Sequence, residues 1–150
     1  MTSKKAVEDF LAQKNIAVVG VSRNGAKSGN KIYEELKSKN YQTYAVNPKA
    51  TKEGDIKFYP DLRSIPEKVD GLVLAVPPAV TDQVVREAHE LGIKHIWMQL
   101  GSESQNAIDF GKEKGINVIH NLCIFMFAEP VESFHKVHKW FSKLFGKLPK

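Results

Sequence analysis

The chain has 150 residues, of which 42% are hydrophobic and 26% charged, and its formal net charge is +5. That is the size and composition of one globular domain with its own core. One cysteine, Cys123, excludes an intramolecular disulfide framework and a multi-cysteine metal cluster, and it fits a reduced setting. No apolar run approaches the roughly 18 residues of a membrane span, and residues 1–13 lack the apolar stretch of a signal peptide. We therefore expect a cytoplasmic protein.

The excess positive charge lies at the carboxyl end of the chain. Residues 131–150 carry five lysines against one glutamate, whereas residues 1–130 are nearly neutral. Binding to a phosphate backbone needs many clustered cations. We therefore expect no nucleic-acid partner for the body of the chain.

Five segments predict strands, and two of them are short continuous apolar runs, as in strands buried on both faces. A weaker pattern between residues 50 and 70 predicts a polar loop, a short strand at residues 58–59 and a turn over residues 60–66. The five predicted strands cover residues 16–21, 41–46, 71–76, 94–100 and 116–120.

Helical periodicity places apolar side chains on one face of residues 29–40, 80–91 and 104–114. Gly92 and Gly115 follow the last two segments and predict their carboxyl-terminal caps. Strands alternating with helices predict an α/β fold over residues 1–130. The fold is a Rossmann-like doubly wound parallel sheet of about five strands, in the order 3-2-1-4-5, with helices on both faces.

The carboxyl-terminal segment, residues 131–150, predicts an amphipathic basic helix, because seven large apolar residues recur there at helical spacing with lysines between them. We expect this stripe to pack on the same domain or on a second subunit in a homodimer, since a soluble monomer rarely exposes so large an apolar patch. The alternative is contact with an anionic membrane or an acidic partner.

Ligands of such a sheet bind outside the carboxyl ends of the strands. The first predicted strand leads into residues 20–25, Gly-Val-Ser-Arg-Asn-Gly, a relative of the glycine-rich phosphate loop with serine at the second glycine. Small residues let backbone N–H groups approach a phosphate. The alternative is a plain turn. The residues predicted to bind the cofactor here are Gly20, Val21, Ser22, Arg23 and Lys27.

The second predicted strand is followed by Asn47, Pro48 and Lys49. An NAD-binding domain usually has an acidic residue here, to hold the ribose 2′-hydroxyl. A lysine suits an adenosine that carries an additional ribose phosphate, which coenzyme A and NADP have and NAD lacks. The alternative is a solvated loop lysine.

Mainly apolar segments follow the third and fourth predicted strands. Two successive prolines remove backbone donors and fix the chain, which predicts a rigid wall for a ligand as well as a helix start. The other segment offers flexible apolar surface and one amide. The candidate residues are Val76, Pro77 and Pro78, then Met98, Gln99 and Leu100.

His120 and Cys123 follow the last predicted strand and could suggest a base and a nucleophile. A lone cysteine after a buried strand is more often a small buried hydrophobe. No predicted strand end carries paired carboxylates or a Ser/His/Asp set. We therefore expect no catalytic residue and no metal site, and a pocket that holds a nucleotide without transforming it.

Five motifs in order resemble those of the small CoA-binding proteins, a family similar to the CoA-binding domain of the succinyl-CoA synthetase α subunit. The resemblance covers about residues 10–126 and is carried by IAVVGVSRNG, YAVNPK, DGLVLAVPP, AHELGIKHIWMQLG and GINVIHNLCI.

The resemblance implies a Rossmann-like domain that binds coenzyme A or an acyl-CoA across the strand ends. It places residues 20–23 at the phosphates, Lys49 at the adenosine phosphate, Val76 and Pro77 on the wall, and residues 98–100 against the nucleotide or pantetheine. Ligase activity is not expected, because that chemistry belongs to a second domain of the synthetase. The alternatives are an NADP- or NAD-binding oxidoreductase or redox sensor, and an interaction protein acting through its basic helix.

Overall fold

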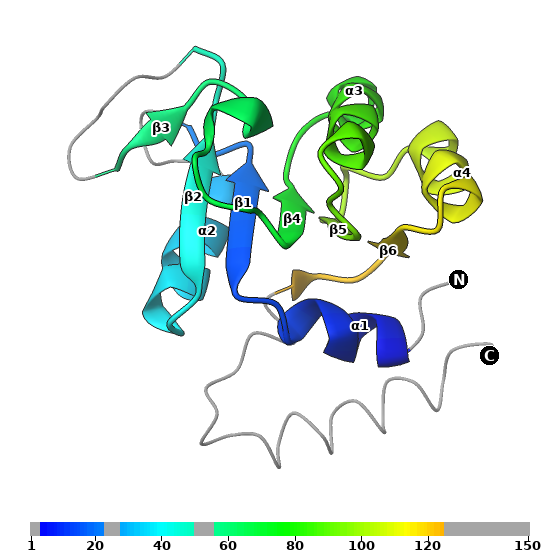
Figure 1. The fold of residues 1–150 in the computed structure, drawn as a ribbon, viewed down its shortest axis with the longest axis horizontal. Coiled ribbons are helices and arrows are strands. Elements are labelled where there is room, and N and C mark those ends of the chain that lie inside the picture. Colours follow the sequence, from blue (N-terminus) through cyan, green and yellow to red (C-terminus); the bar gives the residue numbers. More distant parts are fainter. Residues whose placement is uncertain (1–3, 23–27, 50–55, 125–150) are drawn as a thin grey trace.

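The computed structural model describes residues 4–22, 28–49 and 56–124, and their central element is a parallel sheet of six strands (Figure 1). The Rossmann-like α/β fold is confirmed, with one strand more than the five long candidates. The strands are β1 (Asn15–Val19), β2 (Gln42–Val46), β3 (Phe58–Tyr59), β4 (Gly71–Leu74), β5 (His95–Met98) and β6 (Asn117–Ile119). The helices are α1 (Lys4–Leu11), α2 (Ser28–Ser38), the 3₁₀ turn η1 (Leu62–Ser64), α3 (Pro78–Glu90) and α4 (Gln105–Glu113).

The strands lie in the order β3-β2-β1-β4-β5-β6. The predicted order 3-2-1-4-5 holds when the short strand at residues 58–59 is counted as the third. Applied to the five long candidates alone it is wrong, because residues 71–74 pair with β1 and do not lie beyond β2. The two residues of β3 occupy that outer position and pair with the end of β2.

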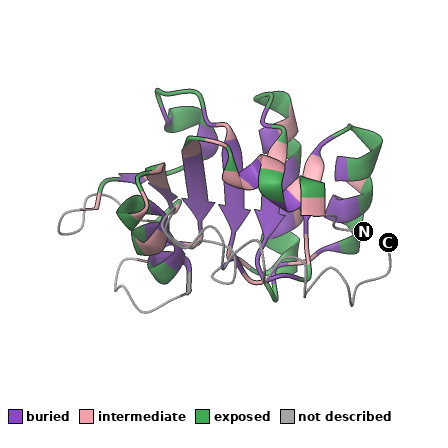
Figure 2. Cartoon of the chain, turned by 90° about the horizontal axis from the view of Figure 1, so that it is seen from below, coloured by how far each residue is buried: buried purple, intermediate pink, exposed green. Residues whose placement is uncertain are grey.

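Side chains that alternate along the strands build a separate core on each face of the sheet. Ile16 and Val18 face the core formed with α1 and α2, whereas Ala17 and Val19 face the core formed with η1, α3 and α4. Figure 1 shows η1 in front of β1 and β2, and α2 behind them. Figure 2 shows the buried strands between these layers, with exposed residues on the outer faces of the helices. Burial on both faces explains the continuous apolar runs.

The ends of the helices follow the predicted turn chemistry. Gly92 and Gly115 have φ values of 78° and 72°, just beyond α3 and α4. A residue with a side chain adopts that left-handed conformation at a cost, and glycine does not. Pro78 is the first residue of α3, where its missing N–H group leaves no helical hydrogen bond unmade.

The amino-terminal helix α1 was not predicted from the sequence. Its Val7 and Phe10 are buried, and the Phe10 ring meets the Trp97 ring edge-on with centroids 5.3 Å apart. The Tyr41 hydroxyl donates to the Leu11 carbonyl over 2.6 Å, and burial raises the pKa of this tyrosine. These contacts hold α1 against the core that it shares with α2.

The carboxyl-terminal helix expected over residues 131–150 lies outside the described residues, as does the boundary expected at residue 130. Within the described part of the chain, no helix combines the length and apolar character needed to cross a membrane.

Candidate functional site

A cavity of about 480 Å³ opens where β1, β2, β3 and β4 end, and it continues along one side of α3. Its volume lies in the range of small-molecule sites. The cavity also lies at the point where the strand order reverses, because β2 lies on one side of β1 and β4 lies on the other. The lining residues are Val19, Gly20, Ser22, Val46, Asn47, Pro48, Lys49, Pro60, Asp61, Leu62, Ala75, Val76, Pro77, Val80, Gln83, Val84 and Glu87.

Two glycines bring the loop after β1 against its neighbours. Gly20 has a φ of 113°, and a Cβ atom there would lie 2.2 Å from the Ala75 carbonyl oxygen. A Cβ atom on Gly29 would lie 2.4 Å from the Gly20 carbonyl oxygen. The predicted motif ends at Gly25, which lies outside the described residues. The glycine that packs helix α2 on the first turn is Gly29.

Asn30 holds Ser22 with three hydrogen bonds, each of 2.9 Å. Asn30 Oδ1 accepts from the Ser22 N–H and from the Ser22 hydroxyl, and Asn30 Nδ2 donates to the Ser22 carbonyl. Ser22, a predicted cofactor-binding residue, lines the cavity. Its N–H, however, is donated within the protein, so the predicted phosphate contact would need other donors. Arg23 and Lys27 lie outside the described residues.

Asn47 links the loops that follow three strands. Its Nδ2 atom donates to the Val21 carbonyl over 2.9 Å, its Oδ1 atom accepts from the Lys49 N–H over 2.9 Å, and its own N–H donates to the Tyr59 carbonyl over 2.9 Å. Lys49 is exposed and lines the cavity. Val21 itself is fully buried in the core on the opposite face, so its side chain does not line the cavity.

The loop after β5 fixes the wall that follows β4. The Val76 N–H donates to the Ser102 hydroxyl over 2.9 Å, and the Thr81 hydroxyl donates to the Ser102 carbonyl over 2.8 Å. Val76 and Pro77, which we expected to form a rigid wall for a ligand, line the cavity. Pro78 is exposed at the start of α3 and does not line it.

The wall formed by η1 and α3 was not predicted from the sequence. The Leu62 N–H donates to Glu87 Oε1 over 3.1 Å, so the 3₁₀ turn is held on the helix. Asp61 caps η1 by accepting from the Ser64 N–H over 2.9 Å. Val80, Gln83, Val84 and Glu87 recur at the spacing of one helix face, and that periodicity was the available signal.

The segment after β5 is not part of the cavity. Met98 is fully buried in the core, beneath α3 and α4, and Leu100 is 55% exposed. Gln99 donates to Cys123 Sγ over 3.1 Å and accepts from the Ile124 N–H over 3.0 Å. These three residues, predicted to contact a nucleotide, lie outside the described cavity lining. The Met98 side chain packs in the core, the Gln99 side chain holds a neighbouring loop, and Leu100 faces solvent.

His120 and Cys123 lie outside the cavity lining. Burial lowers the pKa of His120, and its Nδ1 atom lies 3.0 Å from Asn121 Nδ2. Cys123 Sγ accepts a hydrogen bond from Gln99, not from a histidine. Among the described residues, no group of three His, Cys, Asp or Glu side chains is placed to hold a metal ion.

Comparison with known proteins identifies the family of the chain. Residues 14–129 match the family model described as a CoA binding domain. The ADP-forming acetate–CoA ligase II of Archaeoglobus fulgidus is 37% identical over 90 residues, which are 59% of this chain and 13% of the ligase. An uncharacterized protein of Bacillus subtilis, YneT, is 28% identical over 81% of this chain and 91% of its own length.

The fold is likewise shared with solved structures. A conserved hypothetical protein from Pyrococcus furiosus is 39% identical, with a TM-score of 0.69 over 75% of this chain and 97% of that protein. The chain spans about one eighth of the Archaeoglobus fulgidus ligase, so the likeness concerns one domain of that enzyme. The resemblance identified from five sequence motifs is confirmed, and the chain belongs to the CoA-binding domain family.

Proposed function

We propose that this chain binds coenzyme A or an acyl-CoA in the cavity at the strand ends and catalyses no reaction there itself. The supporting observation is the position of the cavity: in a member of the CoA-binding domain family, it lies at the point where parallel α/β sheets bind nucleotides.

The charge after β2 favours a ligand with a ribose phosphate. Asn47, Pro48 and Lys49 line the cavity there, and none is acidic. A dinucleotide site for NAD would use a carboxylate at this point to accept from the ribose 2′-hydroxyl. The ammonium group of Lys49 instead suits the additional phosphate of coenzyme A.

The absence of catalysis is supported by what the described cavity wall contains. Its carboxylates are those of Asp61 and Glu87, and both accept backbone hydrogen bonds from η1. No histidine or cysteine belongs to the described lining. A general base must lie within hydrogen-bond distance of the proton that it removes from the substrate. The two carboxylates of the described wall are instead engaged in holding η1.

The decisive experiment compares calorimetric titrations of the full chain with coenzyme A and with dephospho-CoA. Lys49→Ala is expected to weaken the binding of coenzyme A by about 1–3 kcal/mol, roughly 5- to 150-fold in Kd. The affinity for dephospho-CoA should stay nearly unchanged. Lys57→Ala removes the same charge from the segment before β3, outside the cavity lining, and is the matched control. Equal losses for both ligands would remove Lys49 from the phosphate site, and an absence of binding to either ligand would refute the proposed function.

Catalysis is tested separately with acetyl-CoA. After incubation with the protein, the thioester is expected to remain intact at the rate of the buffer control, measured by release of free thiol. Protein-dependent release that Glu87→Gln or Asp61→Asn abolishes would contradict a purely binding role.

A further inference from the structure

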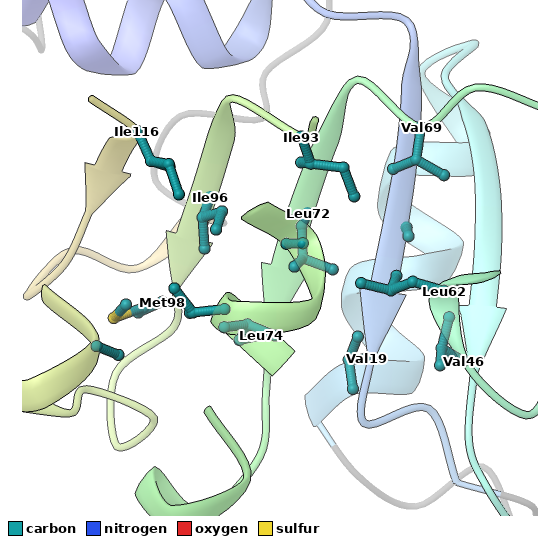
Figure 3. Close-up of a cluster of buried hydrophobic side chains, with 14 of the residues drawn as sticks. Val19, Val46, Leu62, Val69, Leu72, Leu74, Ile93, Ile96, Met98 and Ile116 are labelled. Atoms are coloured by element: carbon teal, nitrogen blue, oxygen red, sulfur yellow. The ribbon is translucent and has the colours of Figure 1, made fainter. Parts of the chain in front are cut away.

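Part of the cavity lies between α3 and η1, and we call this part the slot. Val80 and Val84 of α3 line one side, Leu62 of η1 lines the other, and Val19 and Val46 at the ends of β1 and β2 form the floor. Figure 3 shows Leu62 beside Val19 and Val46 within the core on this face of the sheet. Apolar walls on several sides suit a flat heteroaromatic group better than a charged one.

Glu87 of α3 also lines this slot. It is seven residues after Val80 on the same helix face, which is about 10 Å further along α3. Because α3 begins at the strand ends and runs back along the sheet, Glu87 lies further from those ends than Val80. Its Oε1 atom accepts from the Leu62 N–H over 3.1 Å. Among the described residues, no hydrogen bond to its second carboxylate oxygen is present.

Charge fixes the direction in which a nucleotide can lie. Lys49 is the cation of the described lining and belongs to the end formed by the strand loops, whereas Glu87 is an anion in the slot. Phosphates are therefore favoured near Lys49 and repelled from Glu87. An ionised carboxylate is purely an acceptor, so the group that meets it must carry an N–H or O–H. The exocyclic amine of adenine meets both requirements, because it is an uncharged donor on a flat ring.

We propose that Glu87 is a specificity-determining residue of the cavity and accepts a hydrogen bond from the amino group of an adenine base in the slot between α3 and η1. This inference rests on the proposed function, because it takes the nucleotide to be that of coenzyme A. Glu87 then has two roles: one oxygen holds the η1 wall in place and the other reads the base.

The test uses 1,N6-etheno-CoA, in which the amino group is built into an additional ring and cannot donate. The wild-type chain is expected to bind coenzyme A about tenfold more tightly than the etheno analogue, measured by calorimetry. Glu87→Gln keeps an oxygen for the Leu62 N–H and replaces the other oxygen by an amide donor. This variant is expected to bind coenzyme A about tenfold more weakly than the wild type and to bind the etheno analogue with nearly unchanged affinity. The preference for coenzyme A over the analogue should therefore disappear.

Glu90→Gln is the matched control. Glu90 lies on the same helix, is exposed, pairs with Arg63, and does not line the cavity. The variant should retain the wild-type preference. Equal wild-type affinity for the two ligands would overturn the inference, even if Glu87→Gln fails to fold. A uniform loss of both ligands in Glu87→Gln would also overturn it, because that result is expected of a wall alone. Binding of neither ligand by the wild type would refute the proposed function instead.

Discussion

Replacing Asn30 by alanine tests whether the loop after β1 is held in place by a buried side chain. Asn30 is 6% exposed, and its amide makes three hydrogen bonds of 2.9 Å to Ser22. Each contributes about 0.5–1.5 kcal/mol net. The higher helix propensity of alanine offsets about 0.6 kcal/mol of the loss. We expect Asn30→Ala to lower the free energy of unfolding by about 2–3 kcal/mol in urea titrations.

The second variant, Asn30→Asp, separates stability from binding. Aspartate retains an acceptor for the Ser22 N–H and hydroxyl but sets its second carboxylate oxygen against the Ser22 carbonyl oxygen, so it is expected to cost about 2–3 kcal/mol, as much as Asn30→Ala. It also places a negative charge beside the predicted phosphate loop, so coenzyme A should bind at least tenfold more weakly. Asn106→Ala, at an exposed position of α4, is the control. An Asn30→Ala variant as stable as this control would refute the reasoning.

Two further predictions concern backbone conformation and pH. Gly20→Ala should lower the free energy of unfolding by more than about 3 kcal/mol or prevent folding, because it combines a φ of 113° with a Cβ contact of 2.2 Å to a backbone oxygen. Gly92 has a φ of 78° and open space around it, so Gly92→Ala should lower the free energy of unfolding by about 1–2 kcal/mol. Urea titrations measure both values. Burial lowers the pKa of His95 below its ordinary value near 6.5, so the unfolded chain takes up the proton first as pH falls. The stability contributed by the neutral ring should be complete above pH 6.5 and decline below it; an unchanged urea midpoint between pH 7.5 and 5.5 would contradict this. His95→Gln should flatten the decline in part, since the pKa of His120 is lowered in the same direction.

The strands and the three longer helices could be predicted because their signals are local. Apolar runs such as residues 16–19 reflect burial on both faces, and glycines at positions 92 and 115 end helices through their φ angles. Helix α1 escaped prediction because it has eight residues and two buried side chains, although Val7 and Phe10 have helical spacing. Its stability comes from Trp97 and Tyr41, which are far away in the sequence.

The candidate site was predictable only where the strand loops build it. The places of Gly20, Asn47, Lys49 and Val76 follow from the rule that ligands bind at strand ends. The wall formed by η1 and α3 depends on a hydrogen bond between residues 62 and 87, and no local pattern encodes that pairing. Met98 shares the sheet face of the cavity-lining Val19 but lies two strands away from it, a separation that the strand-end rule does not encode. Leu74 and Met98 pair in register and both face the core under α3 and α4.

The position of α1 has a consequence for synthesis of the chain. The Ala6 carbonyl accepts a hydrogen bond of 2.9 Å from Asn117 Nδ2, and Phe10 packs on Trp97, so α1 is covered by segments made about 90 to 110 residues later. At roughly 5–20 residues per second, a ribosome needs about 5–20 s to make that stretch. Throughout this interval Val7 and Phe10 lack the part of their native cover that β5 and β6 supply. A nascent chain stalled before residue 95 therefore exposes apolar side chains of this segment, and the arrival of β5 and β6 covers them.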